Sequence, residues 1–191
     1  MNNPGTPRLG YGSRHPELVA ILQSLTPAAS ELTNWGTLRL RISAYLSKRR
    51  LPDPIITSVR CLVEVDGQIV VTESPDDVNV WPGGRREPGE TMRQTAVREV
   101  YEETGWQVEA ESLLLLGFLH LEHLAPPPAD YAYPHPDFIQ LVFRCRASTR
   151  ASDDWRDLDG YVLRSWLDTP ARARQHALAP VSLPFLDALV Q

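Results

Sequence analysis

The chain has 191 residues, of which 42% are hydrophobic and 23% are charged, and its formal net charge is −5. This length suits one ordinary globular domain with a core of its own plus a short extension. The acidic balance argues against a protein that binds nucleic acid stably through a broad cationic face. Cys61 and Cys145 are too few for a disulfide framework, and we expect both to be buried structural thiols.

The start of the chain and its apolar runs give no sign of targeting or of membrane insertion. Residues 1–16 are rich in Pro and Gly, and they lack the apolar stretch of a secretory signal. The most apolar run, "LLLLGFL", is far too short to span a membrane. We therefore expect a cytoplasmic protein with no membrane partner.

Two helices are predicted in the first fifty residues. In "PELVAILQSL", Leu18, Ile21 and Leu25 recur at helical spacing. A second helix is predicted from about Gly36 to Arg49, with Asn34 as its N-cap and basic residues suited to the negative end of its dipole.

The hydrophobic period changes to two after the prolines at positions 52 and 54. In "SVRCLVEVDGQIVVTE" apolar and polar residues alternate on either side of Asp66-Gly67, which predicts a β-hairpin. We therefore divide the chain into a flexible and helical extension at 1–52 and a main domain at 53–191.

The main domain mixes strands with helices and lacks regular βαβ repetition. Strands are predicted within 108–124, 137–148 and 161–167, and helices at 92–104 and near the end of the chain. This pattern predicts an α+β sandwich.

The helix predicted at 92–104 carries an unfavourable arrangement of charges. Thr91 and Gln94 match a capping box, and Gly105 stands where a C′ glycine ends a helix. A like-charged i,i+4 pair costs roughly 0.2–0.5 kcal/mol, and anions in the last turns of a helix cost about 0.3–1 kcal/mol each. Three glutamates nevertheless share one arc of this helix: Glu99, Glu102 and Glu103. A solvated acidic face is one interpretation, and a site for a hard divalent cation, which prefers oxygen ligands, is the other.

The residues upstream of the acids favour the second interpretation. The stretch "GRREPGETMRQTAVREVYEETGW", 84–106, resembles the Nudix box, G-x5-E-x7-R-E-U-x-E-E-x-G-U, in which U is a bulky apolar residue. The matching positions are Gly84, Glu90, Arg98, Glu99, Val100, Glu102, Glu103 and Gly105. Trp106 departs slightly from the usual Ile, Leu or Val at the last position.

The resemblance implies an α/β/α sandwich with a mixed sheet, Mg²⁺ or Mn²⁺ as cofactor, and a substrate with a nucleoside diphosphate linked to another moiety. It implies that Glu99, Glu102, Glu103 and the carbonyl of Gly84 bind the metal. Glu90 and Arg98 are expected to hold the loop and helix together, with Arg98 orienting a carboxylate. Homodimer formation is a further expectation at the level of the family.

The general base is left open between a glutamate of the box, with Glu99 first, and an acid on a later loop. The loop within "HLEHLAPPPADYAYPHPDF", 120–138, is long and rich in Pro, and loops of this kind are often functional. Glu122 in this stretch is a candidate metal ligand or base. A zinc site at His120 and His123 lacks a third ligand and is disfavoured.

Candidate substrate contacts lie in two places. Arg85 and Arg86 beside the glycines are candidates for contacting phosphate, with exposed loop cations as the alternative. Tyr131, Tyr133 and His135 are candidates for stacking on a nucleobase.

These features together predict a Mg²⁺-dependent pyrophosphohydrolase that cleaves the diphosphate bond of a nucleotide or nucleoside-diphosphate derivative by attack of water at phosphorus. The alternative is a non-hydrolytic nucleotide sensor or regulatory module on the same fold. Retention of every acid of the box favours the enzyme.

Overall fold

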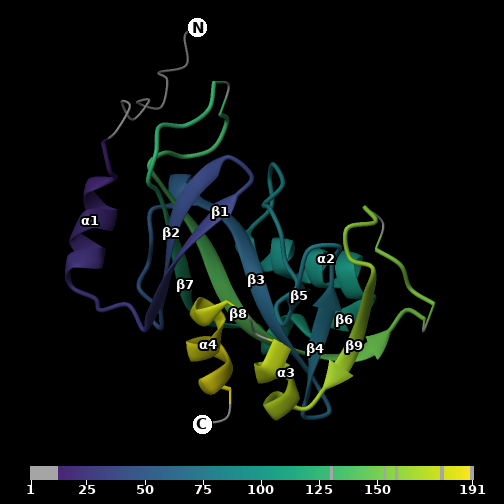
Figure 1. Cartoon of the computed structure of the whole chain (residues 1–191). Coiled ribbons are helices and arrows are strands. Elements are labelled where there is room, and N and C mark those ends of the chain that lie inside the picture. Colours follow the sequence, from purple (N-terminus) through teal and green to yellow (C-terminus); the bar gives the residue numbers. More distant parts are fainter. Residues whose placement is uncertain (1–12, 130, 153, 158, 177–178, 190–191) are drawn as a thin grey trace, which may run out of the picture.

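A nine-stranded mixed sheet forms the centre of the molecule (Figure 1). The computed structural model describes the whole chain except residues 1–12, 130, 153, 158, 177–178 and 190–191. The strands are β1 Ala29–Trp35, β2 Leu38–Tyr45, β3 Ile56–Val65, β4 Gln68–Glu73, β5 Val78–Asn79, β6 Trp106–Val108, β7 Leu114–His123, β8 Asp137–Arg150 and β9 Arg164–Asp168. The α-helices are α1 Pro16–Gln23, α2 Met92–Thr104, α3 Pro170–His176 and α4 Leu183–Asp187.

The strands follow the order β1-β2-β7-β8-β3-β4-β5, with β6 added to β8 and β9 added to β4. The pair of β3 and β8 is parallel, and the other pairs are antiparallel. Because β3 and β8 lie in the middle of this order, residues on these two strands line the centre of each face of the sheet.

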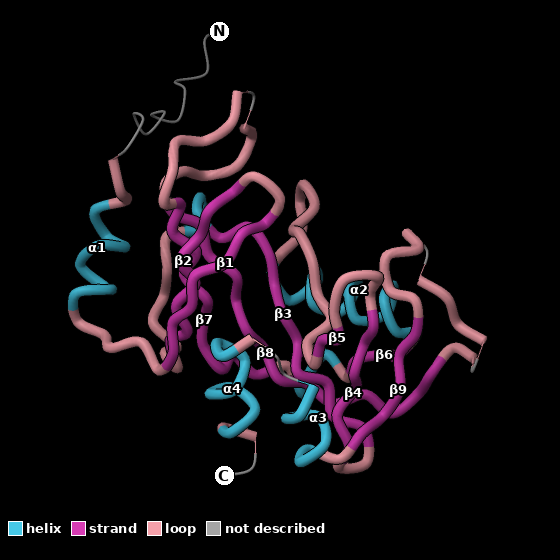
Figure 2. The backbone as a smooth tube through the Cα atoms, in the orientation of Figure 1, coloured by secondary structure: helices cyan, strands magenta, loops and turns pink. Residues whose placement is uncertain are grey.

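Helices cover both faces of the sheet, as the α/β/α prediction requires (Figures 1 and 2). On one face, α2 packs through Ala96 and Val100 against the inward residues of β3, including Cys61. On the other face, Phe185 of α4 joins a core cluster with Leu62 of β3. None of the described helices is long and apolar enough to cross a membrane.

The sequence prediction is confirmed for most elements of the main domain. The hairpin of β3 and β4 turns at Asp66-Gly67, where both residues have positive φ. Helix α2 begins at the predicted capping box and ends at Gly105, which has a φ of 72°. Both cysteines are buried and free, as predicted.

The predicted helix from Gly36 to Arg49 is wrong. Helix α1 is present, but the next segment forms β1 and β2, joined through Gly36 at a φ of 58°. Leu38, Leu40, Ile42 and Ala44 also alternate with polar residues, so the segment fits a strand period. Pairing of β2 with β7 decides the outcome, because it extends the central sheet and buries Leu40 completely.

These pairings bear on the N-terminal extension. Strands β1 and β2 belong to the same sheet as the rest of the molecule, and Leu18 of α1 is buried against Tyr45 and Phe118. The boundary placed at residue 52 stays a prediction.

Gly117 provides a test of this packing. It lies at a register shift between β7 and β8, and a Cβ atom there would stand 2.0 Å from the carbonyl oxygen of Tyr45. We expect Gly117→Ala to lower the free energy of unfolding by about 1–3 kcal/mol, because β2 or β7 must shift. Urea denaturation measures this loss.

The matched surface change is Ser148→Ala on an exposed position of β8, which should stay within about 0.5 kcal/mol of the parent. Equal stability of the Gly117 variant and the parent would contradict the described contact.

Candidate active site

A glycine-containing segment lies beside β3 and carries the start of the site. The amide of Val59 donates to the carbonyl of Gly84 at 3.0 Å, and the amide of Cys61 donates to the carbonyl of Pro82 at 2.9 Å. A Cβ atom on Gly83 would stand 2.4 Å from the carbonyl oxygen of Val59. Glycine is therefore required for this close approach of two backbones.

Arg98 of α2 joins this segment to the acids of the helix. Its Nε donates to Glu90 at 2.7 Å, and its Nη1 donates to Glu99 at 2.9 Å and to Glu102 at 2.8 Å. Its Nη2 donates to the carbonyl of Arg85 at 2.9 Å. The Arg98 guanidinium lowers the pKa of Glu90 to about 2. One arginine thus offsets the repulsion among the carboxylates and fixes the loop on the helix.

Glu103 is held apart from this network. Its Oε2 accepts a hydrogen bond from the amide of Gly83 at 3.0 Å. Burial raises the pKa of Glu103 to about 7, and burial also raises the pKa of Glu99. Arg60 of β3 donates to the carbonyl of Gly83 at 2.7 Å, which places a cation beside both acids.

The donor set fits a hard divalent cation in its chemistry. Glu99, Glu102 and Glu103 line one cavity with Gly84, and a Cβ atom on Gly84 would stand 2.5 Å from a carboxylate oxygen of Glu99. Carboxylate and carbonyl oxygens are the ligands that Mg²⁺ prefers. Within the described residues no three His, Cys, Asp or Glu side chains converge closely enough to hold a metal ion. The carboxylates of Glu99 and Glu102 instead accept hydrogen bonds from Arg98, and that of Glu103 accepts one from the Gly83 amide. The metal ligands therefore stay a prediction.

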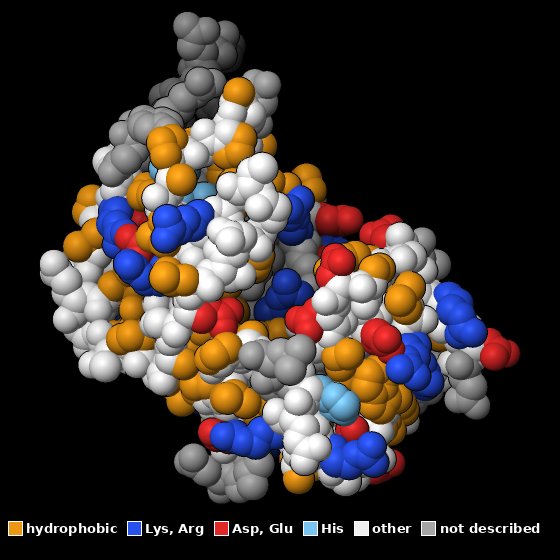
Figure 3. Space-filling model, in the orientation of Figure 1, with side chains coloured by type: hydrophobic (Ala, Val, Ile, Leu, Met, Phe, Trp, Pro, Cys, Tyr) orange, Lys and Arg blue, Asp and Glu red, His pale blue; other side chains and the backbone are white. Residues whose placement is uncertain are grey.

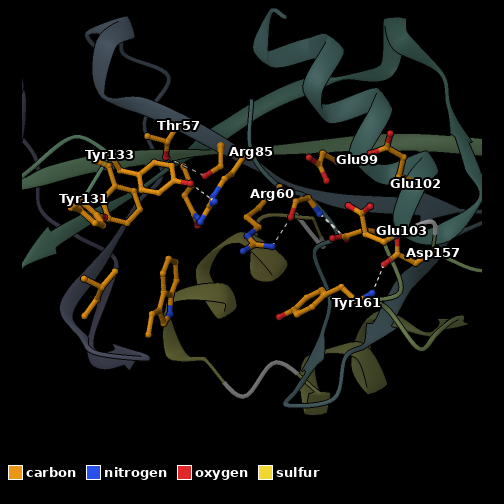
Figure 4. A pocket seen from close by; sticks show the side chains of 18 residues that line it. Thr57, Arg60, Arg85, Glu99, Glu102, Glu103, Tyr131, Tyr133, Asp157 and Tyr161 are labelled. Atoms are coloured by element: carbon orange, nitrogen blue, oxygen red, sulfur yellow. Dashed lines mark hydrogen bonds between the residues drawn. The ribbon is translucent and has the colours of Figure 1, made fainter. Parts of the chain in front are cut away.

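The cavity that contains the acids has a volume of about 590 Å³ and extends from α2 over the N-terminal halves of β3 and β8. Figure 3 shows this face of the molecule hollowed, with basic side chains in the hollow and acidic side chains beside it. In Figure 4, the glutamates of α2 and Asp157 lie at one end, Arg60 lies between, and Arg85, Tyr131 and Tyr133 lie at the other end.

The tyrosine end of the cavity is built by the loop between β7 and β8. The guanidinium of Arg85 lies 4.4 Å from the centroid of the Tyr133 ring and also hydrogen-bonds its hydroxyl group. The Tyr131 hydroxyl is 2.8 Å from Nε2 of His123, and its ring meets that of Tyr133 edge to face at 5.5 Å. The loop thus presents aromatic rings and one cation to the cavity.

The loop between β8 and β9 closes the acid end. Trp155 packs on Gly105, where a Cβ atom would stand 2.6 Å from the indole, and its Nε1 donates to the carbonyl of Glu102 at 3.3 Å. Asp157 lines the cavity, and its Oδ2 accepts the amides of Tyr161 and Val162 at 2.8 Å each. This loop is therefore fixed to the end of α2 with an acid facing the glutamates.

The structure brings together most of the residues that the sequence singled out. The three glutamates of α2 line the cavity, as do Gly84, Arg85, Tyr131 and Tyr133, and Arg98 supports the acids from outside. Arg86 instead pairs with Asp53 at 2.8 Å, so its contact with phosphate has no support in the geometry.

Glu122 and His135 do not line the cavity. The Glu122 carboxylate lies on β7, where it forms ion pairs with Arg14 and Arg41. Nε2 of His135 lies 3.3 Å from the carbonyl oxygen of Ala125.

The disfavoured zinc site at His120 and His123 also fails on geometry. His120 is buried 2.7 Å from Asp137, whereas His123 lies between Tyr131 and the carbonyl of Pro136. The two imidazoles thus have separate structural partners.

Sequence reasoning missed several residues that line the cavity. The alternating patterns place Arg60 and Gln140 on strands but give them no functional role, and Trp35 lies next to the segment wrongly predicted as a helix. All three line the cavity. Gln140 interrupts the apolar run "FIQLVF", and a polar residue at such a position is a sequence signal for a functional side chain. Asp157 carried no such signal, because the loop that positions it is fixed by tertiary packing of Trp155.

Comparison with known proteins gives a family match over most of the chain. A family model described as the NUDIX domain matches residues 54–189. The CTP pyrophosphohydrolase of Escherichia coli (strain K12) is 29% identical over 145 residues, which cover 71% of this chain and 92% of that protein.

Two further relatives match over shorter stretches. Nucleoside diphosphate-linked moiety X motif 6 of Mus musculus is 48% identical over 54 residues, 27% of this chain and 17% of that protein. Nudix hydrolase 3 of Caenorhabditis elegans is 38% identical over 78 residues, 37% of this chain and 31% of that protein. The chain thus spans less than a third of the mouse and nematode relatives.

A solved structure of similar fold is that of the Bacillus subtilis pyrophosphohydrolase BsRppH. It has a TM-score of 0.56 and 18% sequence identity, and it covers 78% of this chain and 89% of its own. At this identity the likeness supports the fold alone.

The raised pKa of Glu103 predicts that ionisation of this acid lowers the free energy of unfolding as the pH rises. An acid whose pKa is raised to about 7 in the folded protein contributes stability below pH 4.5, and this contribution is lost as the pH rises through 7. Glu103→Gln cannot ionise and keeps an acceptor for the Gly83 amide. We expect the variant to be more stable than the parent at pH 8 by on the order of 1–3 kcal/mol.

Urea denaturation in EDTA measures this difference, which should vanish near pH 4. An equal difference at both pH values would show that burial of this charge is not its cause. Glu122→Gln is the control for removal of a carboxylate, because Glu122 pairs with two arginines.

Proposed function

This chain belongs to the Nudix (MutT-like) hydrolase superfamily, and we propose that it is a metal-dependent pyrophosphohydrolase that cleaves the diphosphate bond of a nucleotide or nucleoside-diphosphate derivative. One observation carries this proposal: the three acids of the box share a cavity with Gly84, Arg60 and Arg85. Such a cavity offers oxygen ligands for a cation and guanidinium groups for phosphate.

Mg²⁺ is the proposed cofactor, and Mn²⁺ is expected to replace it. Glu99, Glu102, Glu103 and the carbonyl of Gly84 would hold the ion. The Gly84 carbonyl accepts one bond from Val59 and keeps a second lone pair. When bound, such an ion neutralises charge on a diphosphate and lowers the pKa of a water molecule.

The residues of the chain bind and orient the reactants. Arg85 and Arg60 bind the phosphate groups, and Arg98 keeps the box carboxylates in position. A water molecule attacks one phosphorus atom, its proton passes to a carboxylate, and the other phosphate leaves with the electrons of the broken P–O bond. Glu99 is the first candidate for this base. Asp157 replaces Glu122 as the candidate from a later loop, because it lines the cavity and Glu122 does not.

The relatives support the reaction class. The Escherichia coli relative is named a CTP pyrophosphohydrolase, and its match to this chain covers 92% of its length. We propose a nucleoside triphosphate or a related nucleoside diphosphate derivative as substrate. A homodimer and a cytoplasmic location stay predictions of the family resemblance.

A hydrolysis panel separates the enzyme from the non-hydrolytic sensor. Nucleoside triphosphates, ADP-ribose, dinucleoside polyphosphates and nucleotide sugars are incubated with Mg²⁺ and with EDTA, and phosphate products are measured. We expect turnover of at least one member that EDTA abolishes. Binding of a nucleotide without turnover of any member would favour the sensor.

Substitution of the box acids tests their assignment. We expect Glu102→Gln to lower kcat by about 10²–10³-fold, because a ligand carboxylate is lost while the Arg98 contact is kept through the amide oxygen. Steady-state kinetics at saturating Mg²⁺ measures the loss. Glu122→Gln is the matched control and should stay within about threefold of the parent, so that equal activity of both variants would refute the assignment.

A further inference from the structure

The acid cavity continues into a second cavity of about 770 Å³ on the same face of the sheet. Both cavities are lined by Trp35, Arg60, Glu103, Gln140 and Tyr161. The two cavities therefore form one groove, which runs from the glutamates of α2 toward β1 and β2. A groove of this extent has room for more than a diphosphate and its cation.

Gln140 lies in the part that the two cavities share. On β8 it pairs with Ser58 of β3 and Leu119 of β7, in the middle of the sheet. The residue is only 5% exposed, and Phe138 and Val142 on the same face of β8 belong to the apolar core. Among the described residues, none forms a hydrogen bond with its amide group.

The amide atoms of Gln140 are not among the fully buried, unpartnered side-chain atoms of the described residues, so they face the groove, and water there can bond to them in the free protein. A polar side chain in the middle of an apolar sheet face still loses much of its solvation on folding. A core of Leu119, Phe138 and Val142 would accept an apolar residue at position 140 without this cost. Because the amide borders the groove, a ligand in the groove is the partner that would satisfy it.

Aromatic surfaces lie around the same part of the groove. Trp35 and Tyr133 are each 39% exposed, although side chains of this kind are usually more deeply buried. The Trp35 ring lies 6.2 Å from the ring of Phe138, at an angle of 57°. Exposed aromatic faces beside a polar group that lacks a partner suit a flat, partly polar ring, and a nucleobase is such a ring.

We propose that Gln140 is a specificity-determining residue, which hydrogen-bonds the polar edge of a nucleobase that stacks on Trp35. This inference deepens the proposed function and rests on it for the diphosphate end of the substrate. The groove then holds the base between β1 and β8 and the phosphates between Arg60 and the acids of α2.

The chemistry of the amide gives a sharp test. An amide offers one acceptor and two N–H donors, so it can rotate to pair with a base whose ring nitrogen accepts or donates. A carboxylate only accepts. Gln140→Glu can therefore accept from both the ring N–H and the amino group of guanine. With cytosine, adenine or uracil it keeps only one of the two contacts that an amide makes, and it meets a lone pair in place of the other.

The experiment measures Kd by calorimetry for the α,β-methylene analogues of CTP, UTP, ATP and GTP, with Mg²⁺ at pH 8.5. We expect Gln140→Met to weaken the best-bound analogue at least tenfold. We expect Gln140→Glu to shift the GTP:ATP, GTP:CTP and GTP:UTP affinity ratios at least tenfold toward GTP. Gln107→Met, at an exposed position of β6, is the matched control and should change no Kd.

Trp35→Ala provides a second test that does not depend on folding of a core variant. It should weaken all four analogues by similar factors and leave their ratios unchanged, because stacking tolerates every base. For substrates that are hydrolysed, the Gln140 variants should raise KM with little change in kcat.

The outcomes distinguish this inference from the proposed function. Unchanged affinity ratios in Gln140→Glu, or absence of binding of every analogue to the parent, would overturn the inference. Ratios that move with position 140 in a protein that hydrolyses no nucleotide would uphold it and overturn the proposed function instead.

Discussion

The site depends on the hydrogen bonds of one guanidinium group. Arg98 donates to Glu90, Glu99 and Glu102 and to the carbonyl of Arg85, so it fixes the glycine-containing segment, the helix and the acids in one unit. Without this cation, the carboxylates at the C-terminal end of α2 would repel one another and oppose the helix dipole. The arrangement that is costly for the isolated helix is therefore stabilised by its tertiary environment.

The second constraint is the close approach of the glycine-containing segment to β3. Gly83 has no room for a Cβ atom, and its amide and carbonyl groups serve Glu103 and Arg60. This contact joins Glu103 of the helix and Arg60 of the sheet to the two backbone polar groups of one residue, Gly83. The contact buries the Glu103 carboxylate, which is unfavourable for its charged form and raises its pKa to about 7. Strained or costly features of this kind are typical of functional sites.

Much of the fold and of the acid end could be predicted from the sequence, because both follow from local patterns. The capping box, Gly105 and the spacing of the acids define α2, and Asp66-Gly67 defines the hairpin. The segment from Leu38 to Tyr45 fits both a helix and a strand, and only pairing with β7 distinguishes them. The groove residues Arg60, Gln140 and Asp157 come from three separate elements, so their convergence depends on sheet register and loop packing that one sequence does not encode locally.

The central claim is that the carboxylates of α2 form a divalent cation site beside the glycine-containing segment. Titration of the ¹⁵N-labelled protein with substoichiometric Mn²⁺ tests it directly, because a paramagnetic ion broadens the amide signals nearest to it. The account predicts that signals of residues 83–84 and 99–103 disappear first, and that Glu102→Gln weakens this effect. Selective broadening elsewhere, such as around Glu122 or the acidic turn at 76–77, with the signals of α2 unchanged, would contradict it.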